Sequence, residues 1–332
     1  MTRIFSGIKP TGHMTLGNYL GALRQWVEKD QHRAESLFCV VDLHALTVDH
    51  DPARLRRLSR QGATLLLAAG LDPELCTVFV QSHVDEHARL SYVMECVASD
   101  GEMRRMIQYK EKSVRAQASG QSVRLSLLTY PALMAADILI YGADEVPVGE
   151  DQTQHVELTR DLAERFNHRY GHTFVVPRAV VPEVAARVMD LQDPTAKMGK
   201  SHDATAGIIY LLDEPDTIVK KVRRAVTDSE AGVTYEPETR PGVANLLEIL
   251  SACTGKEPAA LADAYEGSGA LKADTAEAVV ELLRPLQERH ARLSADPGYV
   301  DGVLRDGAAR ARALARPTVD RAYRAIGLLP PA

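Results

Sequence analysis

The chain has 332 residues, of which 45% are hydrophobic and 25% are charged, a composition that suits one large globular domain or two of moderate size. Its longest apolar run, residues 63–70, is far shorter than the roughly 20 residues that cross a bilayer, so we expect no membrane partner. The N-terminus lacks the order of a signal peptide, which favours the cytoplasm. A net charge of −6 gives no global attraction to nucleic acid, so any RNA must be held by local basic patches.

Short β-rich runs alternate with helical patterns as far as about residue 205, which predicts a parallel sheet covered by helices. The predicted strands are residues 3–7, 35–41, 77–81, 144–148 and 173–176. The helices predicted between them, each with apolar residues every three or four positions, are residues 16–30, 53–69, 89–106 and 153–170. Residues 111–124 have only weak periodicity and are predicted to form a mobile surface segment.

Only helical patterns follow residue 205. They cover residues 218–227, 243–254, 257–265, 274–294 and 299–326. The sequence therefore predicts an α/β fold followed by an all-α C-terminal domain. The four cysteines share no CxxC spacing, so we expect neither a zinc site nor a disulfide framework.

A glycine-punctuated turn, residues 6–19, lies between the first predicted strand and the first predicted helix. A helix N-terminus offers unpaired N–H groups and partial positive charge, so phosphate can dock there. Gly17 would let an adenine ring approach the backbone. Taken alone, the segment is equally consistent with an ordinary β-to-α turn.

A second segment, residues 196–201, carries Lys197 and Lys200 three residues apart. Two flexible ammonium groups suit a pyrophosphate that gains negative charge as it leaves. Taken alone, this segment is also consistent with a solvated surface loop.

Together the two segments resemble the HIGH and KMSKS signature motifs of class I aminoacyl-tRNA synthetases, the first present here as Thr15-Leu16-Gly17-Asn18. Further blocks resemble the bacterial tryptophanyl-tRNA synthetases, and they lie at residues 40–47, 130–139, 146–155, 224–229 and 241–247. The resemblance covers nearly the whole chain.

The resemblance implies a Rossmann-like, doubly wound catalytic domain over residues 1–205, with a mobile or dimer-interface insertion at about 85–125. A helical anticodon-binding domain would cover residues 206–332, and its last helix can pack back on the catalytic domain. The implied enzyme is an ATP-dependent ligase that adenylates L-tryptophan and transfers it to the 3′ end of its cognate tRNA, tRNA(Trp), releasing AMP and pyrophosphate. Mg²⁺ would be carried by ATP, because no protein cage of carboxylates is evident. Family members are two-fold dimers, so we expect a homodimer.

The resemblance also assigns site residues. The catalytic set is Asn18, Gln152, Lys197 and Lys200. The residues expected to contact ATP are Lys9, Pro10, Thr11, Thr15, Gly17, Asn18, Gly149, Glu150, Asp151, Val188, Met189, Lys197, Met198, Gly199, Lys200 and Ser201. Those expected around tryptophan are Phe5, Gly7, His44, Tyr130, Met134, Asp137, Val146, Val148 and Gln152. Among several basic clusters we favour one in the helical domain for tRNA, formed by Lys220, Lys221, Arg223 and Arg224.

Indole recognition needs a flat apolar slot and one acceptor for the ring N–H, and Met134 and Asp137, one helical turn apart, supply both. An ionised Asp137 would lack a partner when phenylalanine binds, which predicts strong rejection of that amino acid. Alternatively, Asp137 is a helix residue paired with a cation, and His44 is a satisfied core histidine.

Two positions depart from the family pattern. Lys9 stands where many bacterial members carry Gln, which predicts altered affinity for ATP or inhibitors. Gly199 replaces the usual Ser and loosens the backbone of the lysine segment.

Three alternatives remain at this point. A tyrosyl-tRNA synthetase would need partners for a phenol hydroxyl, and an adenylate-forming ligase that does not use tRNA would lack the basic helical domain. A non-catalytic RNA-binding paralogue would have no use for the two lysines.

Overall fold

The protein is represented by a computed structural model that describes residues 2–118, 120, 122–149, 152–181, 188–199 and 205–329. Within these residues, five parallel strands form one sheet in the order β3-β2-β1-β4-β5. The strands are β1 (Arg3–Ile8), β2 (Glu35–Val40), β3 (Thr77–Val80), β4 (Glu145–Pro147) and β5 (Arg178–Val180). The strand order reverses beside β1, which is the doubly wound arrangement expected from the sequence.

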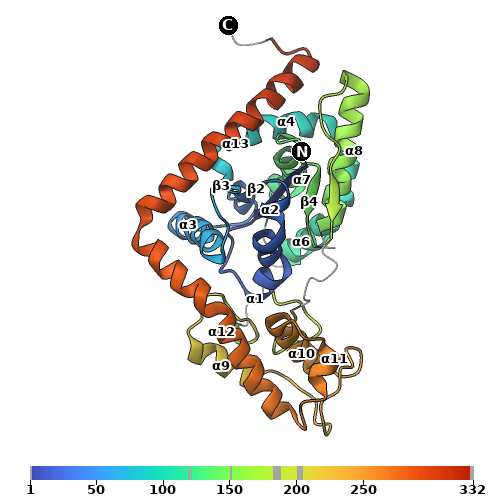
Figure 1. The fold of residues 1–332 in the computed structure, drawn as a ribbon. Coiled ribbons are helices and arrows are strands. Elements are labelled where there is room, and N and C mark those ends of the chain that lie inside the picture. The colour runs from blue at the N-terminus through green and yellow to red at the C-terminus, as the bar shows by residue number, and fades with distance from the viewer. Residues whose placement is uncertain are drawn as a thin grey trace.

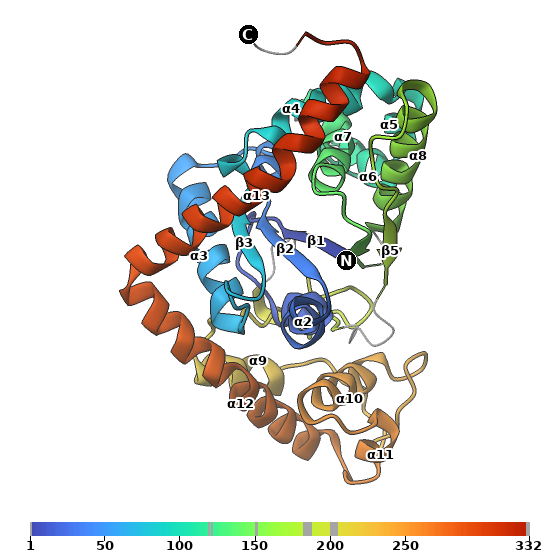
Figure 2. The ribbon, with the colours of Figure 1, turned by 45° about the horizontal axis from the view of Figure 1, so that its top comes forward.

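Helices cover both faces of the sheet (Figures 1 and 2). Successive residues of β2 point to opposite faces: Phe38 and Val40 join a core that includes α3 (Pro52–Ala69), whereas Leu37 and Cys39 join one that includes α7 (Leu125–Leu139) and α8 (Thr153–Tyr170). Because both faces are buried, the strand reads as a nearly continuous apolar run.

The predicted fifth strand, residues 173–176, is wrong. Its backbone is held by a side chain of α8 instead: the N–H groups of Thr173 and Phe174 donate to Asn167 Oδ1, and Asn167 Nδ2 donates to the Phe174 carbonyl. The fifth strand lies further on, at β5.

The first predicted helix is a continuous helical run formed by α1 (Leu16–Asn18), the π-helical segments η1 (Tyr19–Leu23) and η2 (Trp26–Asp30), and α2 (Gln31–Arg33). The predicted helix 89–106 is instead two helices, α4 (Glu86–Val97) and α5 (Asp100–Arg105). Ser99 and Glu102 form a reciprocal capping box that starts α5, which explains the break. Short 3₁₀ turns, η3 (Leu43–Thr47) and η4 (Gln81–His83), follow β2 and β3.

The expectation of an irregular segment at residues 111–124 is wrong for its first half, because α6 (Ile107–Ala118) is helical. Two of its polar side chains bond across one turn, Lys112 Nζ to Gln108 Oε1 at 3.1 Å, and the Ser113 hydroxyl donates to the Lys110 carbonyl at 3.0 Å. Local polar pairs of this kind support a helix that has little apolar periodicity.

Helices alone form the larger elements after residue 207 among those described: α9 (Pro215–Arg223), α10 (Pro241–Thr254), α11 (Pro258–Ala262), α12 (Ser268–Ala295) and α13 (Pro297–Ala325), preceded by a 3₁₀ turn, η6 (Thr205–Gly207). The first four lie below the sheet, and α13 runs back along β3 and α4 (Figure 2). A Cβ on Gly307 would lie 1.9 Å from the Val78 carbonyl oxygen, so only glycine allows α13 to lie this close to β3. Every described helix is too short or too polar to span a lipid bilayer.

Candidate active site

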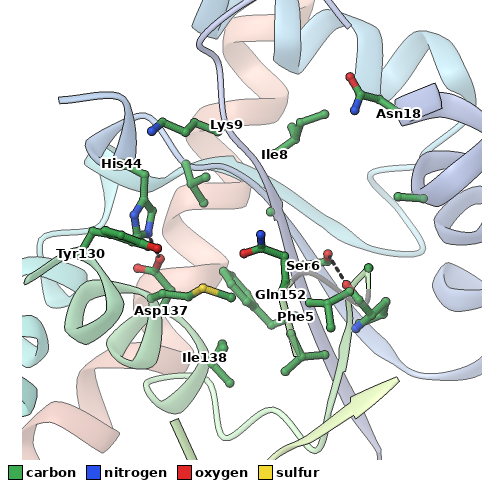
Figure 3. Close-up of a pocket in the computed structure, with 18 of the residues that line it drawn as sticks. Phe5, Ser6, Ile8, Lys9, Asn18, His44, Tyr130, Asp137, Ile138 and Gln152 are labelled. Carbon is green, nitrogen blue, oxygen red and sulfur yellow. Dashed lines mark hydrogen bonds and ion pairs between the residues drawn. The ribbon is translucent and has the colours of Figure 1, made fainter. Parts of the chain in front are cut away.

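A cavity of about 380 Å³ opens at the carboxyl ends of β1 and β4, beside the point where the strand order reverses. Open α/β sheets bind ligands at this position. The cavity wall contains all nine residues predicted around tryptophan: Phe5, Gly7, His44, Tyr130, Met134, Asp137, Val146, Val148 and Gln152. Lys9, Asn18 and Gly149 from the ATP set line the same cavity. Figure 3 shows His44, Tyr130 and Asp137 gathered on one side, with Asn18 lying away from them.

Asp137 is the one acidic residue among the described residues that line the cavity, and both of its carboxylate oxygens accept hydrogen bonds. Its Oδ1 accepts from His87 Nδ1 at 2.7 Å and Gln81 Nε2 at 2.8 Å. Its Oδ2 accepts from His44 Nε2 at 2.8 Å and from the same Gln81 nitrogen at 2.9 Å. Only 1% of Asp137 is exposed, and burial alone would raise its pKa, but His87 and His44 outweigh burial and lower the pKa to about 2. Asp137 is therefore an ionised acceptor.

The tautomer of His87 follows from this network. A carboxylate can only accept, so His87 donates through Nδ1 and its Nε2 accepts from the Tyr141 hydroxyl at 2.7 Å. Burial raises the pKa of Tyr141 well above its ordinary value, which keeps the hydroxyl protonated as a donor. Gln81 is oriented in turn, because its Oε1 accepts from the Leu43 backbone N–H at 3.0 Å.

The network corrects one sequence argument. We expected Asp137 to lack a partner when phenylalanine binds, but His44, His87 and Gln81 already satisfy most of its lone pairs. The sequence argument for rejecting phenylalanine is therefore weaker, because the carboxylate keeps hydrogen-bond partners whether or not a ligand N–H is present. Sequence reasoning missed Gln81 and His87; for Gln81 the available signal was its place as a polar residue directly after the apolar strand β3.

The glycine turn and the lysine segment meet in space, although about 180 residues separate them in the chain. Thr15 caps the helix start in a reciprocal pair with Asn18, and its hydroxyl lies 3.4 Å from the Met198 carbonyl oxygen. A Cβ on Gly17 would lie 3.1 Å from that same oxygen, so a side chain there would press on the lysine segment. The helix start and the residues beside Lys197 are thus in direct contact.

The lysine segment is the second arm of a tight hairpin. Met189 and Lys197 form an antiparallel bridge, Met198 N donates to the Val188 carbonyl at 3.0 Å, and Asp190 N donates to the Ala196 carbonyl at 2.8 Å. Pro10 and Thr11 continue from Lys9 towards the helix start, and Gly199 follows Met198. The remaining members of the ATP set, Glu150, Asp151, Lys200 and Ser201, lie outside the described residues.

The basic cluster proposed for tRNA is only partly available. Lys220, Arg223 and Arg224 are exposed, but Lys221 Nζ lies 2.6 Å from Asp213 Oδ2 and 2.7 Å from the Ile208 carbonyl oxygen. Lys221 is therefore held in an ion pair, unlike the three exposed members, and its part in the cluster stays a prediction.

The sheet order and the contact between the two motif segments define a class I aminoacyl-tRNA synthetase. The family model described as tRNA synthetases class I (W and Y) matches residues 1–284, and the chain belongs to this family. It is 78% identical over 331 residues to a protein named Tryptophan–tRNA ligase 1 of Streptomyces coelicolor, covering 100% of this chain and 98% of that protein.

Solved structures agree. Tryptophanyl-tRNA synthetase from Mycoplasma pneumoniae has a TM-score of 0.92 at 38% identity, covering 99% of this chain and 98% of that one. Tryptophanyl-tRNA synthetase from Campylobacter jejuni, complexed with ADP and tryptophan, has a TM-score of 0.84 at 32% identity, covering 98% of this chain and 100% of that one. The fold and family expected from the sequence are confirmed.

Proposed function

We propose that this protein is a tryptophan–tRNA ligase, which adenylates L-tryptophan with ATP and then charges the 3′ end of tRNA(Trp). The 78% identity over the full chain to a protein of that name carries the proposal. It is supported by a cavity of suitable size that combines apolar walls with one ionised acceptor.

In the first step a carboxylate oxygen of tryptophan attacks the α-phosphorus of ATP, and pyrophosphate leaves with the bridging oxygen. In the second step the terminal ribose hydroxyl of tRNA attacks the activated carbonyl, and AMP leaves. The side chains form no covalent bond in this scheme, so catalysis rests on positioning and on charge balance. Lys197 and Lys200 supply the positive charge, and replacing one of them should lower the rate about 10²–10³-fold, as for other preorganised electrostatic groups.

The indole ring fits between Phe5, Met134 and Val146, with its N–H directed to Asp137 Oδ2. This oxygen already receives His44 Nε2 at 2.8 Å and Gln81 Nε2 at 2.9 Å, but Gln81 Nε2 also bonds Oδ1 at 2.8 Å, so the indole N–H can take the place of Gln81 on Oδ2. The other lining residues hold the α-amino and carboxylate groups, and among them the side chain of Gln152 lies between Asp137 and Asn18 (Figure 3).

The nucleotide lies towards Lys9, Asn18 and the Gly17 backbone, with Met189 on the adenine side. Lys9 lines the cavity and its Nζ lies 3.0 Å from Thr47 Oγ1, which itself donates to the His44 carbonyl at 2.8 Å. Mg²⁺ enters with ATP and offsets phosphate charge. Among the described residues, no group of three or more His, Cys, Asp or Glu side chains could hold a metal ion.

The enzyme acts in the cytoplasm as a homodimer, with tRNA reaching the helical domain. Support for the dimer comes from α4 and α6 in the proposed insertion, where Tyr92 is 69% exposed, Ile107 56% and Val114 64%. Large apolar side chains left exposed in this number are candidates for burial against a second copy of the chain. Exposed Lys220, Arg223 and Arg224 support tRNA contact at the helical domain.

The decisive experiment is ATP–pyrophosphate exchange with each of the twenty amino acids, followed by charging of tRNA(Trp). We expect exchange with tryptophan alone and stable charging. Exchange with tyrosine instead would identify the other branch of the family, and exchange without charging would identify an adenylate-forming paralogue. Sedimentation velocity tests the dimer separately, and a monomer at micromolar concentration would contradict it.

A further inference from the structure

Asn245 on α10 is a buried amide of the helical domain that faces the lysine hairpin. It is 3% exposed, and both ends of its side chain bond the backbone of a single residue, Met189. The Met189 N–H donates to Asn245 Oδ1 at 2.9 Å, and Asn245 Nδ2 donates to the Met189 carbonyl at 3.1 Å. One side chain thus satisfies both backbone groups of Met189 on this edge, as a neighbouring strand would.

Met189 passes this constraint to Lys197 across the hairpin. The two residues form an antiparallel bridge, and the neighbouring pair, Met198 N and the Val188 carbonyl, are joined at 3.0 Å. The carbonyl oxygen of Met198 then faces Thr15 and Gly17 at the helix start. A continuous series of contacts therefore runs from α10 to the helix start, with Lys197 between them.

Two further contacts tie the hairpin to the same domain. The Val226 N–H donates to the Leu191 carbonyl at 2.7 Å, and Gln192 Nε2 donates to the Arg224 carbonyl at 2.8 Å. A Cβ on Gly242, at the start of α10, would lie 2.2 Å from the Val226 carbonyl oxygen, so α10 lies directly against this connection. The hairpin position is therefore set by the helical domain through Met189, Leu191 and Gln192.

We propose that Asn245 is a positioning residue for the ATP site. From the helical-domain side, Asn245 fixes the Lys197 backbone against the helix start. The inference rests on the proposed role of Lys197 at the triphosphate. Loss of Asn245 leaves the Met189 N–H and carbonyl without their partner, so the hairpin shifts or samples several positions. The residues described at 188–198 lie outside the lining of the tryptophan cavity, so the effect falls on ATP and spares tryptophan.

The test compares Asn245→Asp and Asn245→Ser with the wild-type enzyme in ATP–pyrophosphate exchange. Asp keeps the shape and the acceptor but turns a carboxylate oxygen towards the Met189 carbonyl, and Ser is too short to reach both groups. We expect the KM for ATP to rise about tenfold or more in both variants, since each loses at least one buried hydrogen bond. The dissociation constant for tryptophan, measured without ATP by equilibrium dialysis, should change less than about twofold.

Thr275→Val on α12 is the matched control. Thr275 is fully buried in the same helical domain, and its hydroxyl has no hydrogen-bond partner among the described residues, so this variant should keep the wild-type KM for ATP. Folded Asn245 variants with a wild-type KM for ATP, or with equal losses of ATP and tryptophan affinity, would overturn the inference. A wild-type enzyme without exchange activity would instead refute the proposed function.

Discussion

Replacing His87 by Phe should weaken the use of tryptophan, although His87 does not itself line the cavity and acts through Asp137. The new ring can stay between Phe79 and Tyr141, whose centroids lie 6.0 and 5.5 Å from that of His87, but the Nδ1–H that donates to Asp137 is lost. A hydrogen bond to a charged group contributes about 1.5–3 kcal/mol, which corresponds to roughly 10–150-fold in an equilibrium constant. Because Asp137 can then rotate and is more easily protonated, we expect kcat/KM for tryptophan to fall at least about tenfold.

The assay is ATP–pyrophosphate exchange at varied tryptophan, with thermal unfolding of the same samples. Tyr141→Phe is the control, because it removes only the hydroxyl behind His87 and leaves the Nδ1–H on Asp137. That variant should lose about 0.5–1.5 kcal/mol of stability, typical of a neutral hydrogen bond, with little change in kcat/KM. His87→Phe with wild-type kcat/KM for tryptophan and an unchanged melting temperature would refute the role given to the network.

Three further predictions concern other parts of the molecule. Lys9→Gln removes a charge from the cavity wall and should change the KM for ATP or the inhibition constant of a tryptophan analogue; unchanged constants in exchange kinetics would contradict this. Gly307→Ala should destabilise the protein by about 2 kcal/mol or more, because the added Cβ would lie 1.9 Å from the Val78 carbonyl oxygen. An unchanged urea midpoint would show that α13 can move away from β3 at no cost. The pKa values of Asp137, which the two histidines lower against burial, and of Glu102, which the Arg165 hydrogen bond lowers, are both about 2 in the folded protein. The two carboxylates therefore contribute fully to the free energy of unfolding above their unfolded pKa values near 4, and this contribution is lost as the pH falls towards 2. A urea midpoint that stays constant over that pH interval would contradict this prediction.

Patterns with a regular period could be predicted from the sequence. The first four strands were placed within about two residues, and the helix at residues 153–170 was placed at its observed bounds because its apolar face is regular. No bounds were predicted for helix α7, although Met134 and Asp137 were taken to lie on a helix and a family block covers part of it. It packs against α4 and α8, so it is apolar on more than one side and its periodicity is weak.

The cavity wall was predictable, and its supporting network was not. The tryptophan set was carried over from motif blocks, and all of it lies around one cavity. Gln81 and His87 lie outside the family blocks, and nothing in the sequence pairs them with Asp137, which is about 50 residues away in the chain. Asn245 lay inside a family block, yet nothing in the sequence indicates which backbone its amide contacts.

The central claim is that the helix start at Gly17 and the lysine segment bind the same triphosphate. A crystal structure with tryptophan and a non-hydrolysable ATP analogue tests it most directly. The account predicts phosphate oxygens between Asn18 and the Lys197 ammonium group, with the indole N–H at Asp137. A triphosphate bound away from Lys197 and the helix start would contradict it.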